Sequence, residues 1–264
     1  MSSPLPTADL DTWADRLHSA LVDSAPIPPL SDSIPDLDVA GAYAIQQRNL
    51  TRLLGEGARL VGRKIGLTSA PMQQLLGVDE PDYGFILDTM VHPDGGSIPL
   101  SSLCAPRVEP EIAFRLNRPL RGPDVSVADV LDATDAVAAA LEIVDSRIAE
   151  WRITLCDTVA DNASSAAVVL GPWLPINDAP DLDDITASLH LNDEQVDQGV
   201  ATAVLGHPAE AVAWLVNALA VFDTGLQAGE FVMSGSITAA VFVHAGDTAS
   251  ADLSGLGRVS IDFT

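Results

Sequence analysis

Positive charge is scarce in this 264-residue sequence, which has 13 lysine and arginine residues against 37 aspartate and glutamate residues. The formal net charge of −24 argues against nucleic acid and anionic membranes as partners, because no basic cluster is present to meet phosphate groups. Lysine is rarer still, since Lys64 is the only one. Lysine differs from arginine in releasing its proton when desolvated. A site that transfers protons is therefore one explanation for Lys64, and chance is the other.

Cysteine and long apolar runs are also scarce. Cys104 and Cys156 provide neither a disulfide framework nor the spacing of a metal site. We find no apolar run of 18 residues and expect no transmembrane helix. The first 20 residues lack a basic segment followed by an apolar one, so we expect no signal peptide. These absences predict a protein of the reducing cytoplasm.

Apolar periodicity predicts both helices and strands. Helices are predicted over 8–22, 38–60, 69–78, 126–140 and 207–223. Strands are predicted over 59–67, 107–116, 140–148 and 166–171, with a hairpin over 188–199 and further strands after residue 229. Pro110 lacks an N–H group, so one side of its strand should be unpaired there. The sequence indicates an α+β chain, with an N-terminal helical segment over 1–60 and a second domain over 61–264.

Three glutamates lie within apolar segments that read as strands. Glu109 and Glu111 are two residues apart, so a strand places both side chains on one face. Glu142 lies between a leucine and an isoleucine of another segment. Buried carboxylates need a counter-charge, and a hard cation such as Mg²⁺ prefers carboxylate oxygens. The alternatives are that these side chains face solvent or pair with arginines such as Arg107 or Arg147.

Seven segments, in order from about residue 40 to the C-terminus, carry a family resemblance. They are "GRKIGLTSAPMQQLLGVDEPDYG", "PRVEPEIAF", "ALEIVDSRIAEW", "DTVADNASS", "VLGHPAEAVAWL", "MSGSITAAVFVHAGD" and "GLGRVSIDF". Together they resemble the 2-keto-4-pentenoate (2-hydroxypenta-2,4-dienoate) hydratases and 4-oxalocrotonate decarboxylases of the fumarylacetoacetate hydrolase superfamily. The resemblance implies a mixed β-roll of the fumarylacetoacetate hydrolase C-terminal-domain type. It also implies that Glu109, Glu111 and Glu142 hold a divalent ion, usually Mg²⁺, with Mn²⁺ as a substitute.

The same resemblance implies roles for further residues. Lys64 falls on the family's active-site lysine, and Asp82 falls on its acid/base aspartate. Ser164, and the pair Ser234-Gly235, fall on loops that line the substrate pocket. On its own residues, Asp82 has a second interpretation as the cap of a turn.

The activity that the resemblance implies is that of a hydro-lyase. It would add water to 2-hydroxypenta-2,4-dienoate, or a longer homologue, through a metal-stabilised enolate, giving a 4-hydroxy-2-oxo acid in aromatic meta-cleavage or steroid catabolism. One alternative is a 4-oxalocrotonate-type decarboxylase, and another is a non-catalytic partner subunit of a catabolic complex. The expected partners are a small 2-oxo or 2-hydroxydienoate carboxylic acid and further copies of the chain. Association with a downstream aldolase or decarboxylase is a further hypothesis.

Overall fold

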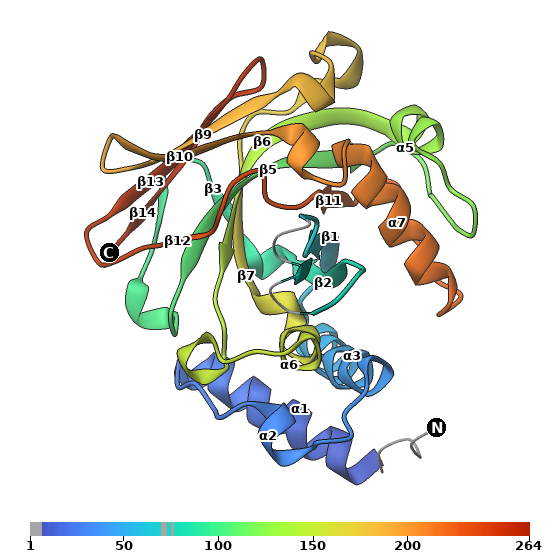
Figure 1. Ribbon diagram of the computed structural model, residues 1–264, viewed down its shortest axis with the longest axis vertical. Helices are drawn as coiled ribbons and strands as arrows, with labels where there is room; N and C mark the ends of the chain where they lie inside the picture. The colour runs from blue at the N-terminus through green and yellow to red at the C-terminus, as the bar shows by residue number, and fades with distance from the viewer. Residues whose placement is uncertain (1–6, 70–72, 75–76) are drawn as a thin grey trace.

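Two β-sheets and a group of N-terminal helices make up the computed structural model, which describes residues 7–69, 73, 74 and 77–264 (Figure 1). The helices are α1 (Thr7–Asp23), α2 (Leu30–Ser33), α3 (Val39–Gly55), α5 (Val127–Ala133), α6 (Leu155–Ala160) and α7 (Pro208–Ala220). The strands are β1 (Leu60–Gly66), β2 (Asp82–Leu87), β3 (Val91–Pro93), β4 (Gly96–Ile98), β5 (Arg107–Leu116), β6 (Thr134–Val144), β7 (Ser165–Leu170), β8 (Leu174–Pro175), β9 (Thr186–Leu191), β10 (Glu194–Val200), β11 (Phe231–Met233), β12 (Val241–Phe242), β13 (Thr248–Leu253) and β14 (Gly257–Phe263).

The larger sheet has nine strands in the order β2-β1-β11-β5-β6-β7-β3, with β12 also paired to β5 and β8 to β6. The smaller sheet has the order β10-β9-β13-β14-β4. The larger sheet curves strongly, and α1, α2, α3 and α6 gather at one end of it (Figure 1). This mixed, curled arrangement agrees with the α+β architecture expected from the sequence.

The central strands β5 and β6 separate two environments. Alternate residues of β5, namely Val108, Ile112 and Phe114, are fully buried in the main apolar core together with residues of α7 and the smaller sheet. The intervening residues of β5, among them Glu109 and Glu111, point to the opposite face. The sheet therefore places the main apolar core on one side, and on the other side the glutamates next to a smaller apolar cluster that includes Ala113 and Met233.

Pro110 interrupts strand pairing near the middle of the larger sheet. On that side of β5, β11 pairs with residues 113–115 and β12 pairs with residues 107 and 108. Between them, the Pro110 carbonyl accepts a hydrogen bond from the Ile237 amide at 3.1 Å. The expected gap in pairing is thus present, and it brings the segment 234–240 next to the polar face of β5.

The helix predicted over 126–140 is wrong in its second half. Helix α5 begins after Ser126, which shares a capping box with Asp129, and it ends at Ala133. Residues 134–144 form β6, which pairs with β5 on one side and with β7 on the other. The alanine-rich run favours a helix by local propensity, but pairing on both sides outweighs that preference.

The N-terminal helices contribute their own apolar cluster, which includes Trp13, Leu17 and Ile45. Residues from later in the chain, Ile148 and Val159, belong to the same cluster and connect it to the rest of the molecule. The division of the chain at residue 60 stays a prediction. Half of the residues in the helix predicted over 69–78 lie outside the described residues.

One segment among the described residues, Ala201–Ala220, is long and apolar enough to cross a membrane by length and composition. Its mean hydropathy is 1.2, and half of it is buried inside the protein. A core helix passes the same test, and α7 supplies Val212, Leu215 and Val216 to the main core. The segment is therefore weak evidence against the expectation that no helix spans a membrane.

Candidate metal and catalytic site

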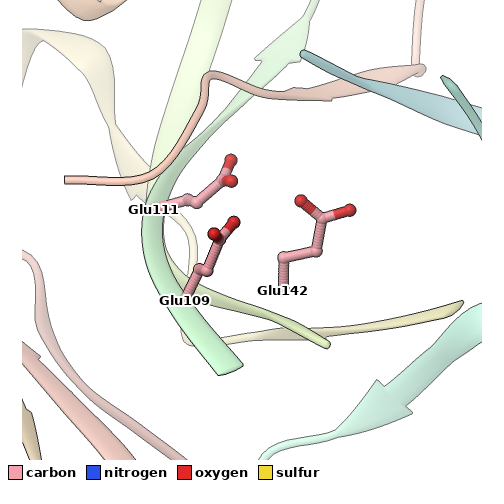
Figure 2. Close-up of side chains that lie close together, drawn as sticks. All are labelled: Glu109, Glu111 and Glu142. Atoms are coloured by element: carbon pink, nitrogen blue, oxygen red, sulfur yellow. The ribbon is translucent and has the colours of Figure 1, made fainter. Parts of the chain in front are cut away.

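Glu109, Glu111 and Glu142 converge on one face of the larger sheet (Figure 2). Glu109 lies directly opposite Glu142 in the antiparallel pairing of β5 with β6, so their side chains share a face. Each of the three carboxylates contributes an oxygen to a group in which all the oxygens lie within 4.8 Å of one another. Such a group has the size and the donor type of a site for a hard divalent cation.

The protein supplies too little positive charge to balance these carboxylates. Glu142 is fully buried, and neither of its carboxylate oxygens accepts a hydrogen bond from the described residues. Glu111 is 1% exposed and accepts a hydrogen bond from the Gly235 amide at 2.8 Å. Burial first, and then the neighbouring Glu142, raise the pKa of Glu109 to about 7. A divalent cation bound by the three oxygens would offset the repulsion among the carboxylates. It would also be a partner for the Glu142 oxygens, which lack hydrogen bonds, so the residues fit a metal ion.

Within the described residues, neither arginine considered as an alternative partner forms an ion pair with the three glutamates, although the charge of Arg107 is near enough to lower the pKa of Glu109. Arg147 forms an ion pair with Asp161 at 2.6 Å. The guanidinium of Arg107 stacks between the rings of Trp151 and Phe242, at 4.3 Å and 4.1 Å from their centroids. Together with the burial of Glu111 and Glu142, these contacts argue against both the solvent-facing and the arginine-paired interpretations.

Lys64 joins the glutamates from β1. It pairs in register with Met233 of β11, which in turn pairs with Ala113 of β5, so these three side chains share a face of the sheet. Glu111 is two residues from Ala113 in the same strand, so it points to that face as well. The ammonium group lies 3.4 Å from Glu142 Oε2 and donates a hydrogen bond to the Ala163 carbonyl at 2.9 Å. Burial alone would lower the pKa of Lys64, but the surrounding carboxylates, Glu142 foremost, outweigh it and raise the pKa. Lys64 is therefore a buried cation in this structure.

Asp82 begins β2, where it pairs in register with Gly66, two residues from Lys64 on the same face of β1, and it is only 2% exposed. Burial is the main cause that raises its pKa, and the charge of Lys64 opposes that rise. Its Oδ1 atom has no hydrogen-bond partner among the described residues. This buried and incompletely bonded carboxylate argues against the turn-capping interpretation, since a turn cap uses its oxygens on nearby amides.

Gly66 keeps the space between Asp82 and Lys64 open. A methyl carbon on Gly66 would lie 2.3 Å from Asp82 Oδ1 and 3.2 Å from Lys64 Nζ. No other residue type fits here unless one of these two side chains moves.

We expect Gly66→Ala to lower turnover by about 100-fold, because displacing a reacting group by about 1 Å has an effect of that order. Metal binding should be retained, since the methyl group faces the Lys64–Asp82 pair and not the three glutamates. Steady-state kinetics and calorimetric metal titration measure the two quantities. Gly55→Ala is the control, because a side-chain carbon there meets nothing within 4 Å. Unchanged turnover in Gly66→Ala would show that the spacing of Asp82 and Lys64 is not critical.

The two predicted pocket loops lie beside this cluster in different ways. Gly235 binds Glu111 through its amide, and it has a φ of 109° that favours glycine. Ser234 is fully buried, and its hydroxyl has no partner within the described part of the chain. The hydroxyl of Ser164 lies 3.2 Å from that of Thr158. The structure thus places Ser234-Gly235 against the glutamates and Ser164 one residue after the carbonyl that holds Lys64.

Ala163 and Gly66 are not among the site residues predicted from the sequence. Ala163 acts through its backbone carbonyl, which carries no side-chain signal in a sequence. Gly66 gave a weak signal as a glycine inside a predicted strand, which often marks a close approach of neighbouring groups. Both residues limit where the Lys64 ammonium group can lie.

The fumarylacetoacetate (FAA) hydrolase C-terminal family matches residues 62–263 of the chain. The chain belongs to this family. Among its relatives, 2-hydroxyhexa-2,4-dienoate hydratase of Comamonas testosteroni is 43% identical over 257 residues, which are 97% of each chain. A 2-keto-4-pentenoate hydratase of Paraburkholderia xenovorans is 45% identical over 250 residues, which are 95% of this chain and 93% of the relative.

A solved structure of a 4-oxalocrotonate decarboxylase from Pseudomonas putida G7, complexed with magnesium and adipate, also resembles this fumarylacetoacetate hydrolase family member. The two chains superpose with a TM-score of 0.97 over the full length of both, at 35% identity. The family resemblance and the fold expected from the sequence are both confirmed. The similarity to a magnesium complex supports a divalent metal ion in this family member.

Proposed function

We propose that this family member is a hydro-lyase that adds water to 2-hydroxypenta-2,4-dienoate, or a longer homologue, to give a 4-hydroxy-2-oxo acid. The observation that carries the proposal is the buried Lys64–Asp82 pair beside three converging glutamates. The relatives named as hydratases support the choice of reaction at 43% and 45% identity. Mg²⁺ is the proposed ion, with Mn²⁺ as a substitute, held by Glu109, Glu111 and Glu142.

When bound, the divalent ion supplies Lewis-acid stabilisation of the negative charge that develops on the 2-oxo end of the substrate. The protein's own residues then move protons. The 2-hydroxyl proton must leave while C5 gains a proton, which gives the α,β-unsaturated ketone. Water must then add its hydroxyl to C4 and its proton to C3, which gives the 4-hydroxy-2-oxo acid. We assign these transfers to Lys64 and Asp82, because both are buried, both are titratable, and both lie beside the glutamates without belonging to the proposed ligand set. Ser164, Ser234 and Gly235 are proposed to contact the substrate.

The decarboxylase is the second candidate, because the structure with a TM-score of 0.97 is a decarboxylase. One experiment separates the candidates: incubation of the purified protein with Mg²⁺ and either 2-hydroxypenta-2,4-dienoate or 2-oxohex-3-enedioate. Loss of the dienol absorbance together with formation of 4-hydroxy-2-oxopentanoate supports the hydratase. Release of CO₂ from the dioate without hydration of the dienol would overturn it in favour of the decarboxylase. Turnover of neither substrate would favour the non-catalytic subunit.

We further propose that the protein forms a closed homo-oligomer in the cytoplasm. Several large apolar side chains are exposed, among them Val22 at 67%, Val221 at 83% and Phe222 at 55%. Both cysteines are free, as a reducing compartment favours. Association with a downstream aldolase or decarboxylase remains a hypothesis.

Light scattering at working concentration should show a species larger than the 27.6 kDa chain. Because each chain carries a formal charge of −24, high salt should favour assembly by screening the repulsion between subunits. A 27.6 kDa species at both low and high salt would refute the oligomer.

A further inference from the structure

The segment Asp161–Ser164, here called the lysine-holding loop, has an unusual backbone. Asn162, Ala163 and Ser164 have φ values of 56°, 49° and 55°. These values lie in the left-handed region, which residues other than glycine rarely adopt. Three such residues in succession do not persist unless the surrounding structure fixes them. The loop is buried, so neighbouring groups are available to do so.

This loop holds the two strands that carry the proposed proton-transfer residues. The Ala163 carbonyl accepts a hydrogen bond from the Lys64 ammonium group of β1 at 2.9 Å. The Asn162 side chain bonds both backbone groups of Phe85 in β2, accepting from the amide at 2.8 Å and donating to the carbonyl at 3.0 Å. Asp82 lies three residues before Phe85 in the same strand. The position of the loop therefore influences both Lys64 and Asp82.

Arg147 anchors the loop through Asp161 and through backbone carbonyls. Its backbone amide donates to Asp161 Oδ2 at 2.9 Å, and its Nε donates to Asp161 Oδ1 at 2.6 Å. Its guanidinium also donates to the carbonyls of Asp145, Asp161 and Ser165, so it bonds to backbone at both ends of the loop. Arg147 and Asp161 are each 3% exposed.

A buried ion pair of this kind is poor evidence for stability, because its desolvation offsets much of its attraction. Its bonds to three separate backbone carbonyls fix the shape of the chain instead. The shape of the loop, in turn, fixes the position of the Ala163 carbonyl, which accepts the hydrogen bond from the Lys64 ammonium group. Neither residue belongs to the glutamate cluster, and the hydrogen bonds of the loop connect the Arg147–Asp161 pair to Lys64.

We propose that Arg147 and Asp161 are positioning residues for Lys64 and act through the lysine-holding loop. The catalytic consequence rests on the proposed function, whereas the placement of Lys64 does not. The pair holds the Ala163 carbonyl where it orients the ammonium group beside Glu142. Loosening the loop should therefore change Lys64 without changing the metal site.

The test uses Ala163→Gly and Asp161→Asn. At a φ of 49°, glycine is relaxed, so Ala163→Gly should keep the melting temperature within a few degrees while freeing the carbonyl. We expect kcat to fall about tenfold or more, with metal affinity unchanged. A merely structural loop predicts the opposite, namely wild-type kcat in a protein that folds as well. Asp193→Gly is the matched control, since Asp193 has a φ of 65° in an exposed hairpin turn.

Because Lys64 is the only lysine, ¹⁵N-lysine labelling gives a single side-chain ammonium resonance. We expect this resonance to shift or broaden at fixed pH in Ala163→Gly and Asp161→Asn. It should be unchanged in Asp193→Gly and in Asp135→Asn, which alters the ion pair with Arg115 on the same sheet.

A wild-type resonance and wild-type kcat in Ala163→Gly would overturn the proposal, even if Asp161→Asn failed to fold. A shifted resonance in a protein whose wild type does not hydrate the dienol would support the positioning of Lys64 and refute the proposed function.

Discussion

Lys64→Arg should lower turnover by at least about 100-fold, the lower limit for a lost acid or base group. The Lys64 ammonium group lies in a buried space, 2.9 Å from the Ala163 carbonyl and 3.4 Å from Glu142 Oε2. A guanidinium is larger and planar, and it does not deprotonate in proteins, so it neither fits the space nor exchanges a proton. Steady-state kinetics with the dienol, together with calorimetric metal titration, measures the effect; metal binding should be preserved.

Arg59→Lys provides the control, because Arg59 is an exposed cation paired with Asp88. Its turnover should equal that of the wild type. Wild-type turnover in Lys64→Arg would instead reduce Lys64 to a balancing charge for Glu142, and the mechanism would then depend on Asp82 and the metal alone.

Glu142→Gln should abolish metal binding and reduce turnover by more than about 100-fold, a loss at least as large as those seen for outer partners of metal ligands. Glu142 is fully buried and lies opposite Glu109, so its carboxylate has no substitute in the cluster. In the absence of metal, removing one buried negative charge relieves repulsion among the glutamates. The same substitution removes the main counter-charge of the buried Lys64, 3.4 Å away, so the two effects oppose each other. The metal-free variant should therefore unfold within a few degrees of the metal-free wild type.

Calorimetry with Mg²⁺ and thermal unfolding with and without EDTA test both parts of this prediction. Glu194→Gln is the matched control, because Glu194 is exposed on β10 of the smaller sheet, whereas the cluster lies on the larger sheet. Metal affinity at the wild-type level in Glu142→Gln would remove this residue from the ligand set.

The site residues that could be predicted from the sequence are those whose charge is unusual for their sequence surroundings. Glutamates in apolar strands, and a lone lysine among twelve arginines, are visible without a structure. The two-residue period of a strand predicts that Glu109 and Glu111 share a face. The pairing of Glu109 with Glu142 is not visible, because strand register depends on contacts between distant segments.

Two features of the fold could not be predicted from the sequence, namely the end of α5 and the backbone conformation at Ala163, and the physical reason is the same for both. The helix predicted over 126–140 ends at Ala133, because β5 and β7 pair with the residues that follow. The carbonyl that holds Lys64 belongs to Ala163, whose left-handed conformation is imposed by the loop and not by its side chain. Tertiary contacts decide both, and local propensity does not report them.

The most direct test of the account is the hydration rate of 2-hydroxypenta-2,4-dienoate by protein stripped of metal with EDTA and then restored with Mg²⁺. If Glu109, Glu111 and Glu142 hold a divalent ion on which the reaction depends, turnover should disappear in the stripped protein. It should return to its initial level as Mg²⁺ is added back. Full activity in the stripped protein, verified as metal-free by elemental analysis, would contradict this dependence on the metal.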